Sequence, residues 1–238
     1  MHYYIPKLKD FRFHPLIEFI IVVSFSLGYF VYLSLQYTHY GNAGLTTVSY
    51  GDTEIFKLVG YELSILLIIF LFLKWQNKDF KIYGFSFSID KITHGLILFI
   101  TNYLLYLLLF KIFGDLLLSS PGNNAGTPAA VNYTINIGVG PLIIFSVLNP
   151  VFEEFILVGY IVSAAGKRFG LIISTAISVF FRLSFHIYQG PVILLSILPM
   201  GIIFTVYFWY KKSIIPLVIG HGVMDFLSFY IFMILYKG

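Results

Sequence analysis

The chain has 238 residues, of which 58% are hydrophobic and only 11% are charged, and its mean hydropathy is +0.88. These values lie far outside the range of soluble proteins and indicate a polytopic membrane protein. The net charge of +4 is not accompanied by a basic groove or a stacking platform, so nucleic-acid binding has no support. The sequence contains no cysteine, which excludes disulfides and thiol catalysis.

Long apolar runs follow one another along the chain, each with about 18 to 25 residues, enough to cross roughly 30 Å of hydrocarbon as a helix. Only helices or closed barrels satisfy backbone polar groups in lipid, and continuous runs rather than alternation favour helices. We therefore predict an all-α bundle of about seven (six to eight) transmembrane helices. The expected spans are residues 15–36, 55–74, 94–113, 140–165, 169–188, 191–210 and 213–236.

The charges outside these spans predict the orientation of the chain. The N-terminal segment carries Lys7, Lys9 and Arg12 before an apolar run that is too long for a signal peptide, so the first span is expected to remain as an anchor. Connections that contain Lys or Arg alternate with two, residues 37–54 and 114–139, that contain neither. This alternation predicts an integral protein of the cell (plasma) membrane with its N-terminus in the cytoplasm.

The distribution of polar residues divides the chain into two parts. Residues 1–139 are expected to form a scaffold of about three helices with outer loops, including the Gly, Pro and Asn-rich stretch 119–136. Lone acids of this part, Glu18 and Glu62, are interpreted as interfacial or packing residues. Residues 140–238 are expected to form a core of about four helices that holds the unusual polar side chains, and function is sought there.

Three polar clusters interrupt the apolar background of the core. Charged groups at membrane depth cost at least a few kcal/mol each, so they normally face a bundle interior or a water-filled cavity and mark functional sites. The first cluster follows a proline that is expected to interrupt its helix, and each of the other two has an i, i+4 spacing that places both members on one helix face. The clusters are Glu153-Glu154 after Asn149-Pro150, Arg182 with His186, and His221 with Asp225.

The chemistry available to these residues is water activation. A carboxylate can take a proton from water while imidazoles hold that water, donate to a developing oxyanion or bind a metal. One Glu with two His is also a ligand set of hydrolytic zinc sites, which makes Glu153, His186 and His221 candidate ligands of one divalent metal such as zinc. Metal-free catalysis remains open. Peptide hydrolysis within the bilayer fits both alternatives.

The ordered trio of motifs resembles the CAAX protease and bacteriocin-processing (CPBP, or Abi) intramembrane proteases. The marks of that family are Glu-Glu-x-x-x-Arg, Phe-x-x-x-His and His-x-x-x-Asn/Asp. They correspond here to "EEFILVG" at 153–159, "RLSFH" at 182–186 and "HGVMD" at 221–225, and the resemblance covers about residues 140–236. Each motif alone is weak, and their order makes the resemblance specific.

The resemblance implies a role for each polar residue of the core. Glu153 would be the base that activates water, and His186 would help to orient that water. His221 and Asp225 would line the oxyanion side, Asp225 standing where many relatives carry Asn. Members of the family cleave prenylated CAAX proteins, process peptides or bacteriocin leaders, or act in bacteriocin self-immunity, with a metal requirement that is unsettled.

Two positions depart from the family pattern. Val158 stands where an arginine is expected, and Arg182 stands where a phenylalanine is expected. The spans that carry Glu154 and Arg182 are joined by the short Lys167-Arg168 turn, so they are expected to pack as antiparallel neighbours. We predict that Arg182 pairs with Glu154 across this interface and replaces the missing arginine as a supporting residue.

Three functions follow from these observations. The first is an intramembrane endopeptidase, a CPBP-type (metallo)endopeptidase acting on a peptide or lipidated protein in the lipid bilayer. The second is a non-catalytic immunity or membrane binding protein that retains the fold, motivated by Val158. The third is a proton-coupled transporter, disfavoured because no inverted repeat is evident. The sequence leaves the oligomeric state open.

Overall fold

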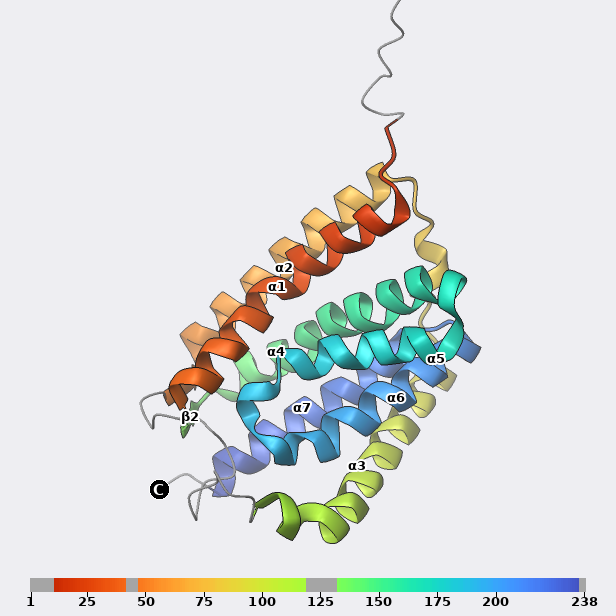
Figure 1. Cartoon of the computed structure of the whole chain (residues 1–238). Helices are drawn as coiled ribbons and strands as arrows, with labels where there is room; N and C mark the ends of the chain where they lie inside the picture. Colours follow the sequence, from red (N-terminus) through yellow and green to blue (C-terminus); the bar gives the residue numbers. More distant parts are fainter. Residues whose placement is uncertain (1–10, 42–46, 119–131, 236–238) are drawn as a thin grey trace, which may run out of the picture.

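The computed structural model describes residues 11–41, 47–118 and 132–235 (Figure 1). In this part of the chain, six helical segments are long and apolar enough to cross a membrane. The prediction of an all-α polytopic membrane protein is confirmed. Lys7 and Lys9 of the N-terminal segment and residues 119–131 of the predicted outer loop lie outside the described residues.

The elements follow the predicted spans closely, because each apolar run is long enough to satisfy its backbone polar groups as one helix. Prolines stand in the first turn of three of the α-helices, where the missing N–H costs nothing. The α-helices are α1 (Pro15–Gly41), α2 (Asp52–Trp75), α3 (Ile89–Leu118), α4 (Val139–Glu153), α5 (Ile161–Ser184), α6 (Leu194–Lys211) and α7 (Ile215–Leu235). The shorter elements are the strands β1 (Thr47–Gly51) and β2 (Asn132–Asn136), the 3-10 turns η2 (Phe80–Tyr83), η4 (Ile187–Gln189) and η5 (Pro191–Ile193), and the π-helix η3 (Glu154–Tyr160).

The apolar segment Val139–Ser184 contains two antiparallel helical stretches rather than one continuous helix. Gly170 has φ 76° and ψ −174°, a conformation that is strained for residues with a Cβ, and no neighbouring atom would touch a Cβ there. The chain reverses at this glycine, so that the end of α5 returns along η3 (Figure 1). The predicted spans 140–165 and 169–188 therefore correspond to the two sides of a single helical hairpin.

Proline 150 does not interrupt its helix, contrary to the prediction. Helix α4 continues through Pro150 to Glu153, and the irregular backbone is the π-helix that follows. Because Pro150 has no N–H, it leaves the carbonyl of Ser146 without its helical donor. Helix α7 packs against this carbonyl at Gly222, where an added Cβ would lie 2.3 Å from the Ser146 oxygen.

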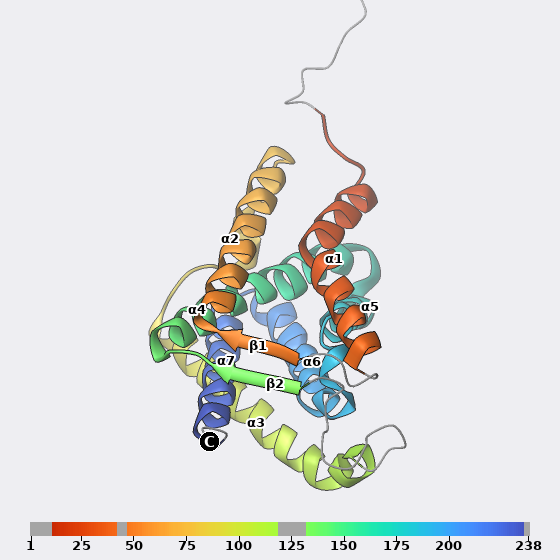
Figure 2. The same ribbon diagram turned by 90° about the vertical axis from the view of Figure 1, so that its left-hand side faces the viewer.

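The connections gather at two opposite ends of the bundle. At one end Lys78 pairs with Glu18 at 2.8 Å, the Ser213 hydroxyl donates to the carbonyl of Gly84, and Gly166 lies against Trp209, so connections predicted to be basic lie together. At the other end β1 and β2 form a parallel two-stranded sheet, in register from Thr47 opposite Asn132 to Gly51 opposite Asn136 (Figure 2). From the sequence, only loops were expected at both of these stretches.

The π-helix η3 forms the centre of the hydrophobic core. All seven of its residues are buried, and its apolar side chains belong to one hydrophobic cluster with side chains of α1, α2, α6 and α7. The largest cluster includes Leu27, Ile65, Phe204 and Leu217, one from each of these helices. Helices of both the scaffold and the core thus contribute to the cluster around the segment that begins at Glu154.

Candidate active site

The glutamate pair lies at the junction between α4 and the π-helix. Glu153 is the last residue of α4 and Glu154 the first of η3, with exposed fractions of 7% and 0%. A π-helix bonds each N–H to the carbonyl five residues before it, and such turns are frequent at functional sites. The backbone N–H of Ile161, directly after the π-helix, follows this pattern, because it donates to the carbonyl of Ile156. The change of helical period occurs directly at the two acids.

Arg182 on α5 binds both glutamates. Its Nη2 donates to the two carboxylate oxygens of Glu154 at 2.8 Å each, and its Nη1 donates to Oε2 of Glu153 at 3.3 Å. The guanidinium is fully buried, and bidentate pairing is the geometry in which arginine binds a carboxylate most strongly. The predicted contact between Arg182 and Glu154 is confirmed. Arg182 therefore supplies, from the other side of the helical hairpin, the positive charge that an arginine at position 158 would provide.

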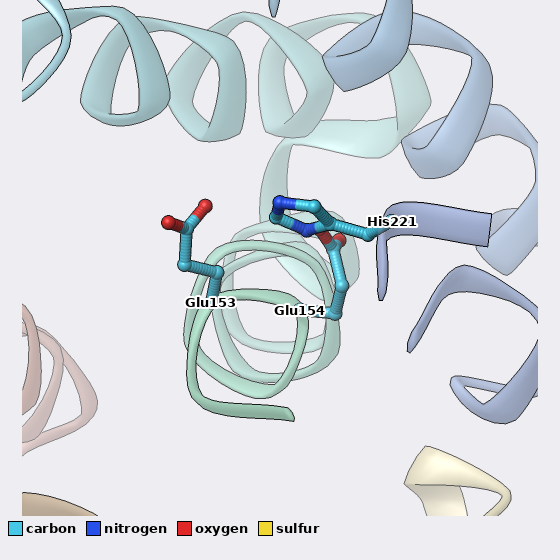
Figure 3. Close-up of side chains that lie close together, drawn as sticks. All are labelled: Glu153, Glu154 and His221. Carbon is cyan, nitrogen blue, oxygen red and sulfur yellow. The ribbon is translucent and has the colours of Figure 1, made fainter. Parts of the chain in front are cut away.

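His221 on α7 closes the other side of Glu154. Its Nδ1 lies 2.7 Å from Glu154 Oε1, and its Nε2 lies 3.4 Å from Asp225 Oδ1, in the predicted i, i+4 arrangement. Asp225 in turn accepts a hydrogen bond from the Asn149 side chain at 3.0 Å. Figure 3 shows the imidazole reaching over Glu154 towards Glu153, which projects from the other side of the same helix. Asn149, Asp225, His221 and Glu154 therefore form one continuous series of polar contacts, in which the contact between His221 and Asp225 is the longest.

His186 has a different position from the one predicted. Helix α5 ends at Ser184, so His186 lies in the following turn and does not share a helix face with Arg182. It remains within electrostatic range of Arg182 and His221, and its Nδ1 is buried without a hydrogen-bond partner in the described residues. His186 thus lies beside the cluster with a free ring nitrogen, while no contact to Glu153 is formed.

The side chains that lie close enough to share a cation differ from the predicted ligands. Ligand atoms of Glu153, Glu154 and His221 lie within 4.8 Å of one another, and His186 does not belong to this group. Both oxygens of Glu154 already accept from Arg182, and one also contacts His221. The buried guanidinium places a positive charge where a divalent cation would be held. This donor set therefore fits a metal poorly.

A cavity of about 510 Å³ opens between α3, α7 and the start of α6. Its wall is largely apolar, with Asn102, Gln189 and Ser196 among its polar members. Met224, next to Asp225, lines one side, and Gln189, in the turn after His186, lines another. The cavity therefore borders the elements that carry two of the predicted site residues.

Two polar residues near the cluster were not identified as site residues from the sequence. Asn149 was noted only beside a proline expected to break the helix, yet its amide fixes Asp225. Glu62 was assigned to packing or the interface, yet it is 2% exposed and within electrostatic range of Glu153, Asp225 and His221. The signal was its position in the apolar stripe of α2, where it replaces a hydrophobic residue.

The comparisons with known proteins agree with the motif analysis. The family described as type II CAAX prenyl endopeptidase Rce1-like matches residues 135–227, the segment that contains Glu153, Arg182, His186, His221 and Asp225. Neither a curated protein nor a solved structure matches the chain. Residues 135–227 of this polytopic membrane protein are thus similar to the Rce1-like family, and this similarity is consistent with the intramembrane proteases of the CPBP family.

Proposed function

We propose that the protein is an intramembrane endopeptidase in which Glu153 activates the water that attacks the peptide bond. The observation that carries this proposal is the buried cluster in which Arg182 binds Glu154 fully and Glu153 through one oxygen only. Among the described residues, none donates a hydrogen bond to the second oxygen, Oε1 of Glu153. Glu153 therefore retains an acceptor for a proton from water, whereas Glu154 is held as the structural partner of the arginine.

The reaction needs one proton transfer in each direction. Water gives a proton to Glu153 as its oxygen bonds to the carbonyl carbon, and Glu153 then gives this proton to the leaving nitrogen as the C–N bond breaks. His186, whose Nδ1 is free, helps to orient the water from the turn after α5. The carboxyl product and the amine product balance the water consumed.

His221 and Asp225 act on the oxyanion side of this reaction. The Nδ1 contact with Glu154 is short, whereas the Nε2 contact with Asp225 is 3.4 Å long. The Nε2–H is therefore available to donate to the oxygen that becomes negative during attack, and donors fixed before the reaction stabilise such charge most effectively. Asn149 and Asp225 keep the ring in this orientation.

The proposed substrate class is supported by the similarity to the Rce1-like family and by the apolar cavity. A membrane-associated peptide or lipidated protein, of the CAAX type or of the bacteriocin or pheromone type, presents apolar groups that suit the wall of the cavity between α3 and α7. Pockets with a largely apolar wall and a few polar groups are the usual form of such binding sites.

The proposal is tested by incubating the purified protein with a peptide library and comparing wild type with Glu153→Gln at equal folded yield. We expect cleavage by the wild type and a loss of about 10²- to 10⁴-fold in the variant, the usual range for a general base. Glu54→Gln, which alters an exposed acid on α2, is the matched control and should cleave normally. Cleavage should also persist in the presence of a metal chelator. Equal cleavage by wild type and Glu153→Gln, or none by either, defeats the assignment of Glu153.

The non-catalytic immunity protein and the proton-coupled transporter make different predictions. The first requires that Glu153→Gln preserve protection or partner binding, and the second requires proton uptake into liposomes without proteolysis. The immunity function was motivated by Val158. Because Arg182 provides the charge that Val158 does not, this motivation is weaker than the sequence indicated.

A further inference from the structure

Glu62 is a buried acid on the face of α2 that packs into the bundle. The other buried residues of this helix are apolar: Ile55, Val59, Ile65, Ile69 and Leu73. Glu62 occupies the position between Val59 and Ile65 in this stripe and is only 2% exposed. A carboxyl group in such a place is costly unless it is paired or hydrogen-bonded. Its presence in the stripe therefore calls for a partner.

No donor within the described residues satisfies Glu62. Its Oε2 is buried and has no hydrogen-bond partner there, although buried polar atoms normally have one. Glu18 provides the contrast, because this equally buried acid of α1 pairs with Lys78 and accepts a hydrogen bond from the Tyr160 hydroxyl. Glu18 is explained by its protein contacts, and Glu62 is not.

The surroundings of Glu62 connect it to the candidate active site. The charged groups within its electrostatic range are Glu153, Asp225 and His221. The ring of Phe30 lies 5.6 Å from the ring of Tyr61 and also 5.6 Å from that of Phe152, so one aromatic side chain bridges the residues that precede Glu62 and Glu153. Helices α2 and α4 also pack against each other. The unpartnered oxygen of Glu62 therefore belongs to the side of α2 that packs towards the groups proposed to carry out hydrolysis.

We propose that Glu62 is a positioning residue whose Oε2 accepts a hydrogen bond from the water that Glu153 activates. This inference rests on the function proposed above. Water has two O–H groups, and directing one towards Glu153 and the other towards Glu62 leaves its oxygen lone pair facing the carbonyl carbon. Glu62 takes no proton in the reaction. Glu62 fixes the second O–H of the water, and His186 approaches the same water from the turn after α5.

Three substitutions separate this role from a structural one. Glu62→Leu removes every acceptor, Glu62→Gln keeps one acceptor oxygen beside an NH₂ group that can only donate, and Glu62→Asp keeps the carboxyl group on a shorter side chain. We expect kcat to fall about 10²-fold in Glu62→Leu and by less in Glu62→Gln, the size of effect that follows misplacement of a reacting group, with KM unchanged. Glu62→Asp should recover part of the lost kcat. Glu18→Gln is the control for a buried scaffold acid and should leave kcat unchanged.

A spectroscopic readout tests the contact without relying on cleavage. The infrared band of Glu62, assigned by its loss in Glu62→Gln, should shift on transfer from H₂O to D₂O and shift again in Glu153→Gln. If the wild type cleaves no substrate, the proposed hydrolysis is wrong, and this band still decides whether Glu62 shares a water with Glu153. Wild-type kcat in folded Glu62→Gln and Glu62→Leu, or a band that is indifferent to D₂O and to Glu153→Gln, would overturn the inference.

Discussion

At the scale of single residues, the buried arginine is the most consequential feature of the site. Arg182 is fully buried and holds two carboxylates that are themselves nearly inaccessible. Removing one partner of a buried ion pair leaves an uncompensated charge and typically costs about 3 to 5 kcal/mol, although the complete pair contributes much less net stability. Loss of Arg182 would therefore leave two buried carboxylates without their positive partner, and this cost is larger than the net stability that the intact ion pair adds.

Arg182→Phe, which restores the family residue at this position, should unfold or inactivate the protein. The double variant Val158→Arg with Arg182→Phe places the positive charge on the same helical segment as Glu154 and should recover most of the function. Thermal unfolding and peptide cleavage measure both effects. Arg168→Phe, at an exposed arginine of the same helix, is the control and should behave as wild type. A harmless Arg182→Phe, or a double variant as inactive as the single one, would mean that Val158 marks a degenerate site.

Some of these residue positions could be predicted from the sequence, and others could not. The pairing of Arg182 with Glu154 was predictable, because an antiparallel hairpin brings side chains at similar depths together. The position of His186 was not, since nothing in the sequence indicated that α5 ends at Ser184 rather than continuing to residue 188. The burial of Glu62 towards the site could not be predicted either, because the apolar stripe of α2 does not indicate which helix it packs against.

At the scale of elements, close helix packing determines where His221 lies. Gly222 brings α7 against the Ser146 carbonyl of α4, next to the proline that leaves this carbonyl without a helical donor. The sequence identified the spans of both helices but not this contact. Proline and glycine patterns predict local conformation, whereas the contact depends on how two distant segments pack.

Gly222→Ala should displace α7 from α4 and reduce activity strongly. Its Cβ would lie 2.3 Å from the backbone oxygen of Ser146, which cannot rotate away as a side chain would. Overpacking of this kind typically costs about 1 to 3 kcal/mol and should separate His221 from Glu154. Gly60→Ala on α2, where no atom lies within 4 Å of the added Cβ, should be neutral or slightly stabilising. Thermal unfolding and peptide cleavage compare the two, and wild-type activity in Gly222→Ala would refute the expectation.

At the scale of the whole molecule, the basic connections lie at one end of the bundle and the two-stranded sheet at the other. The alternation of Lys and Arg in the sequence predicted this grouping because odd and even connections of a bundle lie on opposite sides. The sheet was not predicted, since its strands are separated by the whole of α2 and α3 and have little hydrophobic pattern.

The orientation of this bundle can be tested directly because the chain has no native cysteine. We expect Phe169→Cys and Tyr210→Cys, both exposed near the basic end, to react with a membrane-impermeant maleimide only after cells are lysed. Ser49→Cys and Asn136→Cys, at the sheet, should react on intact cells. These substitutions keep every Lys and Arg, so the charges that direct insertion are unchanged. The reverse labelling pattern would place the N-terminus outside.

The reversal at Gly170 has a consequence for the surrounding lipid. The part of α5 after this glycine, residues 171–184, is about 21 Å long at 1.5 Å per residue, whereas the hydrocarbon layer is about 30 Å thick. A helix that is too short is met by local thinning of the bilayer, by snorkelling of its flanking residues or by oligomerisation. The turn that carries His186 then lies below the headgroups of an undisturbed leaflet, and thinning there shortens the path by which bulk water reaches Glu153.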